Sequence, residues 1–204
     1  MLPFTHVVEA HDGGRRLVGV GTTGGFGGGN TRTGLNFETE RDLLTAIAHA
    51  PGYTVAGSVI YYRGGEVARS YKKNALYRML AERGIDYRQH LSKKLLPDDA
   101  IYVVVNNTMF IIELKFQQIA GSVDEKLQTC DFKKKQYRKL LAPLNFEVEY
   151  FYILNDWFRK PEYKDVLDYV ISVGCQYYFH YLPLQKLGLP VPEADDKMLA
   201  QLAA

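Results

Sequence analysis

The sequence predicts an α/β fold in which helices flank a central mixed β-sheet. Runs rich in β-branched and aromatic residues alternate along the chain with amphipathic segments. Both faces of the best-defined hairpin, residues 101–116, are apolar, which is typical of strands covered on both sides. With 204 residues, of which 47% are hydrophobic, the chain is long enough for one domain with a full core. We divide this domain into a glycine-rich segment 1–33, a core 34–190 and a tail 191–204.

The first half of the chain carries signals for two helices and two strands. Asn36 is a good N-cap for a helix whose apolar stripe includes Leu43 and Ile47, and Pro51-Gly52 ends that helix. Gly84 stops the second helix. The expected elements are a short strand at 17–20, a flexible or tightly turned glycine loop at 24–29, a helix at 36–48, a strand at 53–62, a turn at 63–66 and a helix at 72–83.

The second half begins with the hairpin and continues with helices and strands in alternation. Pro143 ends the long helix that follows the hairpin, and the strand after it is apolar enough to be buried. The expected elements are strands at 101–105 and 108–116, a helix at 124–141, a strand at 146–154, a helix at 162–171 and a last strand at 176–181.

Two carboxylates and a lysine meet at the open end of the hairpin. A two-residue turn at Asn106-Asn107 brings Asp98 opposite Lys115. Because side chains alternate along a strand, Asp98, Glu113 and Lys115 then share one face, and Asp99 points to the other. A three-residue turn would exchange the roles of Asp98 and Asp99, and the sequence leaves both open.

Charges in such an apolar setting are usually paired or bound to metal, because an isolated buried charge is costly. The pattern of an acidic residue two positions before a lysine also occurs four times in polar sequence, at Asp124, Asp131, Glu162 and Asp195. Only Glu113 ends an apolar strand. Two carboxylates beside an amine suit the cleavage of a phosphodiester with Mg²⁺.

The combination of Pro97-Asp98 with Glu113-Leu114-Lys115 resembles the PD-(D/E)XK nuclease superfamily, and the resemblance spans residues 34–190. It implies a restriction-endonuclease-like core. It also implies that Asp98, Glu113 and the Leu114 carbonyl bind Mg²⁺, for which Mn²⁺ substitutes, and that Lys115 orients or deprotonates the attacking water. An acidic residue on the first core helix, here Glu38, often assists in that family.

One branch of the superfamily, the recombination nucleases, carries a Gln-x-x-x-Tyr motif on a helix. This chain has Gln136 and Tyr137 side by side, which argues against that branch. The resemblance implies hydrolysis of double-stranded DNA, and we expect a sequence-specific type II restriction endonuclease. A palindromic site would favour a homodimer, because symmetric protein matches symmetric DNA. The alternatives are a structure-specific repair or junction nuclease and a non-catalytic DNA-binding member of the fold.

Basic residues gather in three groups although the net charge is only +2. We expect loop arginines to read bases and the lysines at 133–135 to contact the DNA backbone. Gln117, just after the hairpin, is a candidate to orient water or bind phosphate. The DNA-binding candidates are Arg32, Arg63, Arg69, Lys72, Lys73, Gln117, Lys133, Lys134 and Lys135.

The remaining features bound the setting of the protein. The sequence has no apolar run long enough to span a bilayer and no signal peptide, so we expect no membrane partner. Cys130 and Cys175 are far apart and read as buried, reduced thiols of a cytoplasmic protein. For the glycine-rich stretch 19–29 we consider a loop that closes over DNA or a disordered flap. It lacks the helix that a dinucleotide-binding fingerprint requires.

Overall fold

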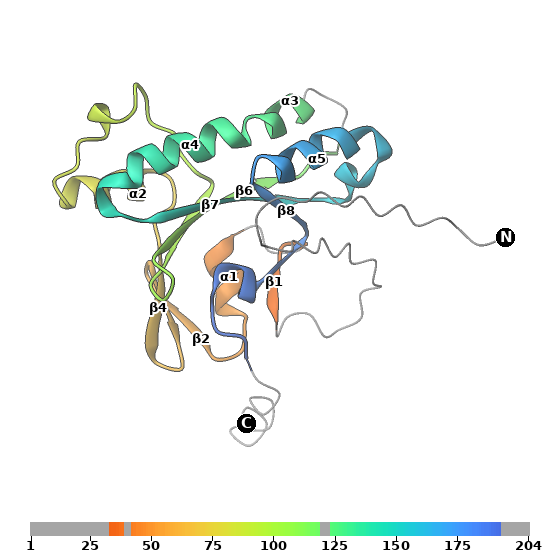
Figure 1. Cartoon of the computed structure of the whole chain (residues 1–204). Coiled ribbons are helices and arrows are strands. Elements are labelled where there is room, and N and C mark those ends of the chain that lie inside the picture. The colour runs from red at the N-terminus through yellow and green to blue at the C-terminus, as the bar shows by residue number, and fades with distance from the viewer. Residues whose placement is uncertain (1–32, 39–41, 119–122, 193–204) are drawn as a thin grey trace, which may run out of the picture.

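A seven-stranded mixed sheet forms the centre of the fold in the computed structural model, which describes residues 33–38, 42–118 and 123–192 (Figure 1). The strands lie side by side in chain order, antiparallel from β2 to β6 and parallel from β6 to β8. Their bounds are β2 Tyr53–Ala56, β3 Val59–Tyr62, β4 Gly65–Ser70, β5 Asp99–Val103, β6 Thr108–Lys115, β7 Glu147–Leu154 and β8 Gln176–Phe179.

Helices cover both faces of this sheet, as the sequence predicts (Figure 1). One face carries α2 (Asn74–Glu82), α3 (Val123–Gln128), α4 (Cys130–Leu141) and α5 (Lys164–Ser172). The other face carries α1 (Leu43–Ala48) and a two-stranded sheet of β1 (Gly34–Asn36) and β9 (Tyr181–Pro183). Short 3₁₀ turns complete the chain at Tyr87–Gln89, Ala142–Leu144, Asp156–Arg159, Pro161–Tyr163 and Leu184–Leu187.

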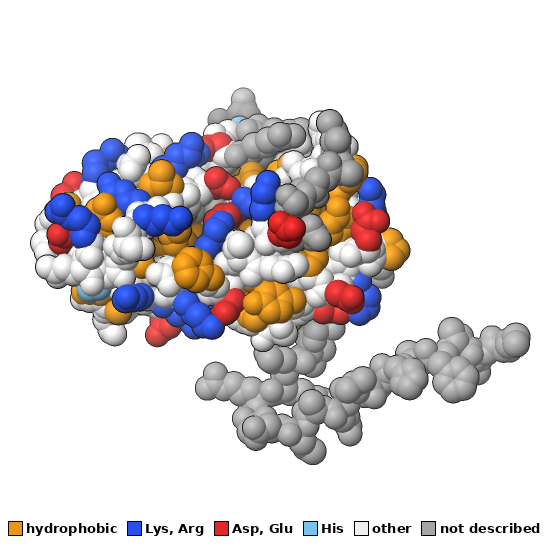
Figure 2. Space-filling view, turned by 90° about the horizontal axis from the view of Figure 1, so that it is seen from above, with side chains coloured by type: hydrophobic (Ala, Val, Ile, Leu, Met, Phe, Trp, Pro, Cys, Tyr) orange, Lys and Arg blue, Asp and Glu red, His pale blue; other side chains and the backbone are white. Residues whose placement is uncertain are grey.

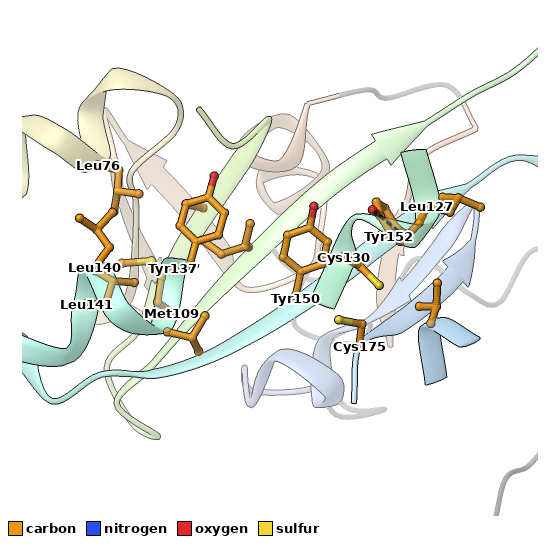
Figure 3. Close-up of a cluster of buried hydrophobic side chains, with 14 of the residues drawn as sticks. Leu76, Met109, Leu127, Cys130, Tyr137, Leu140, Leu141, Tyr150, Tyr152 and Cys175 are labelled. Carbon is orange, nitrogen blue, oxygen red and sulfur yellow. Dashed lines mark hydrogen bonds between the residues drawn. The ribbon is translucent and has the colours of Figure 1, made fainter. Parts of the chain in front are cut away.

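The two faces of the sheet bury separate apolar cores because side chains alternate along each strand. On β6, Met109 and Ile111 face the helices α2, α4 and α5, whereas Phe110 and Ile112 face α1 and the small sheet. In the first core, the rings of Tyr150 and Tyr152 from β7 lie beneath α4 (Figure 3). The strands of the hairpin are therefore covered on both sides.

The sulfur atoms of Cys130 and Cys175 face each other within the first core (Figure 3). Both residues are buried and both are free thiols, as the sequence predicts. In the part of the chain that the structure describes, no helix is long and apolar enough to cross a membrane.

The first helix is shorter than predicted, because a different residue caps it. Asn36 ends β1, and its side chain accepts a hydrogen bond from the backbone N–H of Glu38. The cap of α1 is Asp42, whose side chain accepts from the Thr45 backbone N–H at 3.1 Å. Glu38 is exposed and outside the helix. The predicted strand at 17–20 and the glycine loop at 24–29 lie outside the described residues.

Two other predicted elements are divided in the structure. The strand expected at 53–62 is the hairpin of β2 and β3, which turns at Gly57 with φ of +60°. The helix expected at 124–141 is divided at Thr129 into α3 and α4. The turn at 63–66, the helix α2 and the strand β7 lie close to their predicted places.

The central hairpin has a four-residue connection instead of the two-residue turn. Val103 pairs with Thr108, and Asp99 pairs with Ile112, so the register differs from the prediction by two residues. Asn107 adopts a φ of +52° and donates from its side chain to the Asn145 carbonyl at 2.7 Å. Because a shift of two residues preserves the faces of a strand, the predicted division of side chains between the faces is unaffected.

Helix α4 is fastened to the sheet by a buried lysine. Lys134 donates to Glu149 on β7 at 2.8 Å and to the Gly174 carbonyl at 2.5 Å. Its side chain is 5% exposed, whereas that of the neighbouring Lys135 is 68% exposed and pairs with Asp131. A buried ammonium needs such partners, because its removal from water is costly.

We expect Lys134→Ala to lower the free energy of unfolding by about 2 kcal/mol or more, because it leaves Glu149 and the Gly174 carbonyl without their donor. Lys135→Ala, the matched control one residue away, should change it by less than about 0.5 kcal/mol. Urea denaturation of the two variants measures both values. Equal destabilisation by the two substitutions would contradict this account of Lys134.

Candidate active site at the open end of the central hairpin

The structure brings Asp98, Glu113 and Lys115 together at the open end of the hairpin. The Lys115 Nζ atom lies 3.0 Å from Glu113 Oε2 and 3.6 Å from Asp98 Oδ2. Asp98 is half-exposed, but the Glu113 side chain is only 6% exposed. The cluster therefore joins a carboxylate that solvent reaches to one that the fold buries.

A second lysine, from α4, binds the same glutamate. Lys133 Nζ lies 2.8 and 2.9 Å from the two carboxylate oxygens of Glu113. Burial raises the pKa of Glu113, but the charges of Lys115 and Lys133 more than offset this, so the pKa lies below its ordinary value. Glu113 is therefore held as a carboxylate at neutral pH.

Asp99 points to the opposite face, as the alternation of side chains predicts. Its side chain is 2% exposed, and its Oδ1 atom has no hydrogen-bond partner among the described residues. The Lys72 Nζ atom is 3.8 Å away and is bound more closely by Asp42. Burial raises the pKa of Asp99 to about 7, and the hydrogen bond to Asp42 raises the pKa of Lys72.

A cavity of about 360 Å³ opens on the face of Asp99. Asp98 belongs both to this cavity and to the ion pair with Lys115, so it links the two faces. The lining residues are Lys72, Lys73, Asp98, Asp99, Leu114 and Phe116.

The residues expected to hold Mg²⁺ are two carboxylates and one carbonyl. Among the described residues, no group of three or more His, Cys, Asp or Glu side chains could hold a metal ion. Asp98 and Glu113 nevertheless supply hard oxygen donors, and the Leu114 carbonyl adds one that faces Lys115 Nζ at 3.5 Å. Mg²⁺ usually keeps several waters and takes one or two carboxylates, so the chemistry of these donors suits it. Both oxygens of Glu113 are bound by lysines in this structure, so a metal ion would have to share them or displace a lysine.

The acidic residue near the first helix is Asp42, and Glu38 does not join the site. Glu38 is exposed and outside α1, and its backbone N–H donates to the Asn36 side chain. Asp42 caps the helix and binds Lys72. The sequence signal for Asp42 is its place directly before the apolar stripe that begins at Leu43.

The three consecutive lysines have three different surroundings, because each residue of a helix turns by about 100°. Lys133 points to Glu113, Lys134 is buried between α4 and the sheet, and Lys135 is exposed to solvent. The interior position of Lys134 does not fit the DNA contact expected for it. A charge run alone does not reveal these directions, but the buried Tyr137 and Leu140 fix the phase of the helix.

The structure does not bring Arg63 and Arg69, two of the expected base-reading arginines, to this cluster. Arg63 lies in the turn before β4, whereas the opposite end of that strand leads to Lys72. Arg69 is bound by Glu66 at 2.5 and 3.0 Å. Arg32 lies outside the described residues.

Gln117 follows β6 and is held by Asn155, which begins the segment after β7. The Gln117 backbone N–H donates to Asn155 Oδ1 at 3.2 Å, and Asn155 Nδ2 donates to the Gln117 carbonyl at 2.7 Å. These bonds fix the backbone just beyond Lys115. Lys72 and Lys73 line the cavity on the other face.

A basic segment leads into Asp98, and the sequence prediction included only its first two residues, Lys72 and Lys73. Residues 72–96 hold seven Lys or Arg residues and two acidic ones in a chain of net charge +2. Figure 2 shows Lys and Arg side chains gathered over the α2 end of the helical face. A charge count by segment would have found it. The exposed basic residues that follow Lys73 are Arg78, Arg83, Arg88, Lys93 and Lys94.

Fold and site together define an α/β protein with a lysine–carboxylate cluster at the open end of its central hairpin. Comparison of the chain with protein-family models, curated proteins and solved structures finds no match. The resemblance to the PD-(D/E)XK nucleases therefore rests on the residues of this chain alone.

We expect Asp99→Asn to raise the free energy of unfolding at pH 8 and to leave it nearly unchanged at pH 4. The Asp99 pKa rises from its ordinary 3.8 to about 7 on folding, so stability is lost as the pH rises through this window. The asparagine cannot ionise and escapes this loss, which is on the order of 2–4 kcal/mol above pH 7.

Urea denaturation in EDTA between pH 4 and pH 8 checks this expectation. The control is Asp156→Asn, since that side chain is 72% exposed. Parallel pH curves for wild type and Asp99→Asn would show that burial of Asp99 carries no such penalty.

Proposed function

We propose that this protein is a metal-dependent endonuclease that hydrolyses phosphodiester bonds in double-stranded DNA. The observation that carries the proposal is the placement of Lys115 within 4 Å of two carboxylates, Asp98 and Glu113, at the ends of adjacent strands. This is the cluster that the PD-(D/E)XK resemblance requires. A mixed sheet with helices on both faces also agrees with a restriction-endonuclease-like core.

The carboxylates position both the lysines and the metal site. Asp98, Glu113 and the Leu114 carbonyl would hold Mg²⁺, or Mn²⁺ in its place. When bound, the ion supplies a more acidic water and offsets phosphate charge. Lys115 lies between the two carboxylates, where its ammonium group orients a water by hydrogen bonding and, once deprotonated, accepts a proton from it.

Lys133 adds a second positive charge on the same face of the hairpin. Its Nζ atom is fixed by Glu113, so it needs little reorganisation to offset the charge that develops on a phosphate at the cluster. This role differs from the surface contact to the DNA backbone that the sequence suggested.

The basic segment 72–96 supports a polyanionic substrate, because Lys and Arg side chains bind phosphates and release counterions. Among the DNA endonucleases we favour a sequence-specific restriction enzyme, because the chain is short and has loop-rich insertions before the core. A palindromic site would make it a homodimer, because symmetric protein matches symmetric DNA. A structure-specific repair or junction nuclease is the second candidate, since the same cluster serves branched DNA. A non-catalytic DNA-binding protein is the third.

The first test is digestion of phage and plasmid DNA with Mg²⁺. We expect discrete fragments from the wild type and a loss of at least about a hundredfold in rate for Lys115→Ala, because water at the cluster loses its positioning amine. Lys164→Ala is the matched control, since Lys164 pairs with Asp168 on the surface of α5 and the variant should cut normally.

The pattern of products separates the candidates. Cleavage of branched substrates alone would favour the repair class. Equal activity of Lys115→Ala and wild type would exclude the cluster as the active site. No cleavage of any DNA with Mg²⁺ or Mn²⁺ would contradict the enzyme proposal.

We expect Lys133→Ala to lower the cleavage rate at saturating DNA by at least about tenfold while changing DNA affinity by less than about threefold. The reason is that Lys133 contacts the buried Glu113 and is not part of the exposed basic segment. Single-turnover kinetics and a binding titration in Ca²⁺ measure the two quantities. The control is Lys139→Ala, because Lys139 is an exposed lysine on the same helix. A loss of DNA affinity equal to the loss of rate would instead indicate that Lys133 contacts the DNA backbone.

A further inference from the structure

The cavity on the Asp99 face has the size of a small-molecule site. Its volume of about 360 Å³ falls at the lower end of the range of about 300–1,000 Å³ for ligand pockets. Its lining includes Asp98 but neither Glu113 nor Lys115, so the rest of the lysine–carboxylate cluster does not fill it. Leu114 and Phe116 form an apolar wall along the end of β6.

Asp99, a wall residue of this cavity, carries a buried acceptor without a donor. Asp99 Oδ1 accepts no hydrogen bond from any described residue, although the side chain is only 2% exposed. Such an orphan acceptor is costly, and a bound donor would satisfy it. Lys72 does not act as the donor to Asp99 Oδ1, because its ammonium group is bound by Asp42 and lies 3.8 Å from that oxygen.

The cavity also offers a donor. Lys73 is exposed, lines the cavity, and makes no ion pair with a carboxylate in the described ranges. Its backbone N–H donates to the Pro97 carbonyl at 3.2 Å, which ties the start of α2 to the residue before Asp98. The cavity thus combines an apolar wall, an acceptor and a donor.

We propose that this cavity binds a guanine base turned out of the duplex, and this rests on the proposed function in that DNA would present the base. Guanine is planar and suits the wall of Leu114 and Phe116. Its N1–H and N2–H groups lie side by side and would donate to Asp99, and its O6 atom would accept from Lys73. A bare cation fits poorly beside two lysines, and a bare anion fits poorly beside two aspartates.

Asp98 connects this base site to the proposed cleavage site. It lines the cavity and also faces Lys115 at 3.6 Å. A phosphate held at the lysine–carboxylate cluster therefore leaves the base of the same or the next nucleotide within reach of the cavity. The cavity would then select the nucleotide beside the cleaved bond.

The direct test measures binding of the four deoxynucleosides in EDTA by saturation-transfer NMR and calorimetry, so that neither metal nor cleavage is involved. We expect deoxyguanosine to bind with a Kd below about 1 mM and at least tenfold more tightly than the other three. Asp99→Asn should weaken it at least tenfold, because the amide cannot accept both N–H groups. Asp156→Asn, at an exposed aspartate, should not.

Two further measurements complete the experiment: binding by the Lys73→Met variant, and binding of 5′-mononucleotides by the wild type. Lys73→Met should weaken deoxyguanosine severalfold, because O6 loses its donor, while the exposed position leaves the fold intact. Binding of all four 5′-mononucleotides but of no nucleoside would reveal a phosphate site and overturn the proposal. Preference for another base would overturn the assignment to guanine.

Duplex substrates show whether the guanine that the cavity binds belongs to DNA or to a free nucleoside. If DNA presents it, replacing the guanine next to the cut by inosine, which lacks the N2 amino group, should slow cleavage by wild type but not by Asp99→Asn. Deoxyguanosine binding without any DNA cleavage would retain the cavity as a nucleoside site and reject the nuclease. DNA cleavage without deoxyguanosine binding would reject the cavity alone.

Discussion

A buried carboxylate held between two lysines organises the end of the sheet on which the candidate site depends. Glu113 is almost fully removed from solvent at the end of β6, where a charge persists only if partners surround it. Lys115 supplies one partner from the same strand, and Lys133 supplies the other from α4. Because these bonds tie helix to strand, they help to hold α4, the end of β6 and Asp98 in place relative to one another.

The charge distribution of the protein matters more than its total. A net charge of +2 conceals a strongly basic stretch at 72–96 that runs directly into Asp98. Some of the acidic residues that balance it elsewhere form local ion pairs, as Asp131 does with Lys135 and Asp168 with Lys164. The positive potential is therefore concentrated beside the lysine–carboxylate cluster, where a polyanion would meet it.

The features that could be predicted from the sequence depend on local pattern. Strand alternation placed Asp98 with Glu113, and apolar periodicity located α2 and β7, because both signals reside in a few neighbouring residues. The turn length could not be predicted in this way. Asn106-Asn107 suits a tight turn locally, but the two side chains bond to the Leu187 and Asn145 carbonyls, and those partners are distant in the chain. The ion pair between Asp42 and Lys72 could not be predicted either, because the two residues are far apart in the chain and meet only after folding.

The four-residue connection between β5 and β6 leaves the cluster sensitive to the parity of the pairing register. A shift of two residues slides one strand along the other and keeps every side chain on its own face, whereas a shift of one residue turns a whole strand over. Related chains that share this cluster should therefore differ in pairing register by even numbers. An odd change in the length of the connection is tolerated where the extra residue stays unpaired in the loop or where a bulge absorbs it. The loop can thus drift in length during evolution as long as the faces of the two strands are kept.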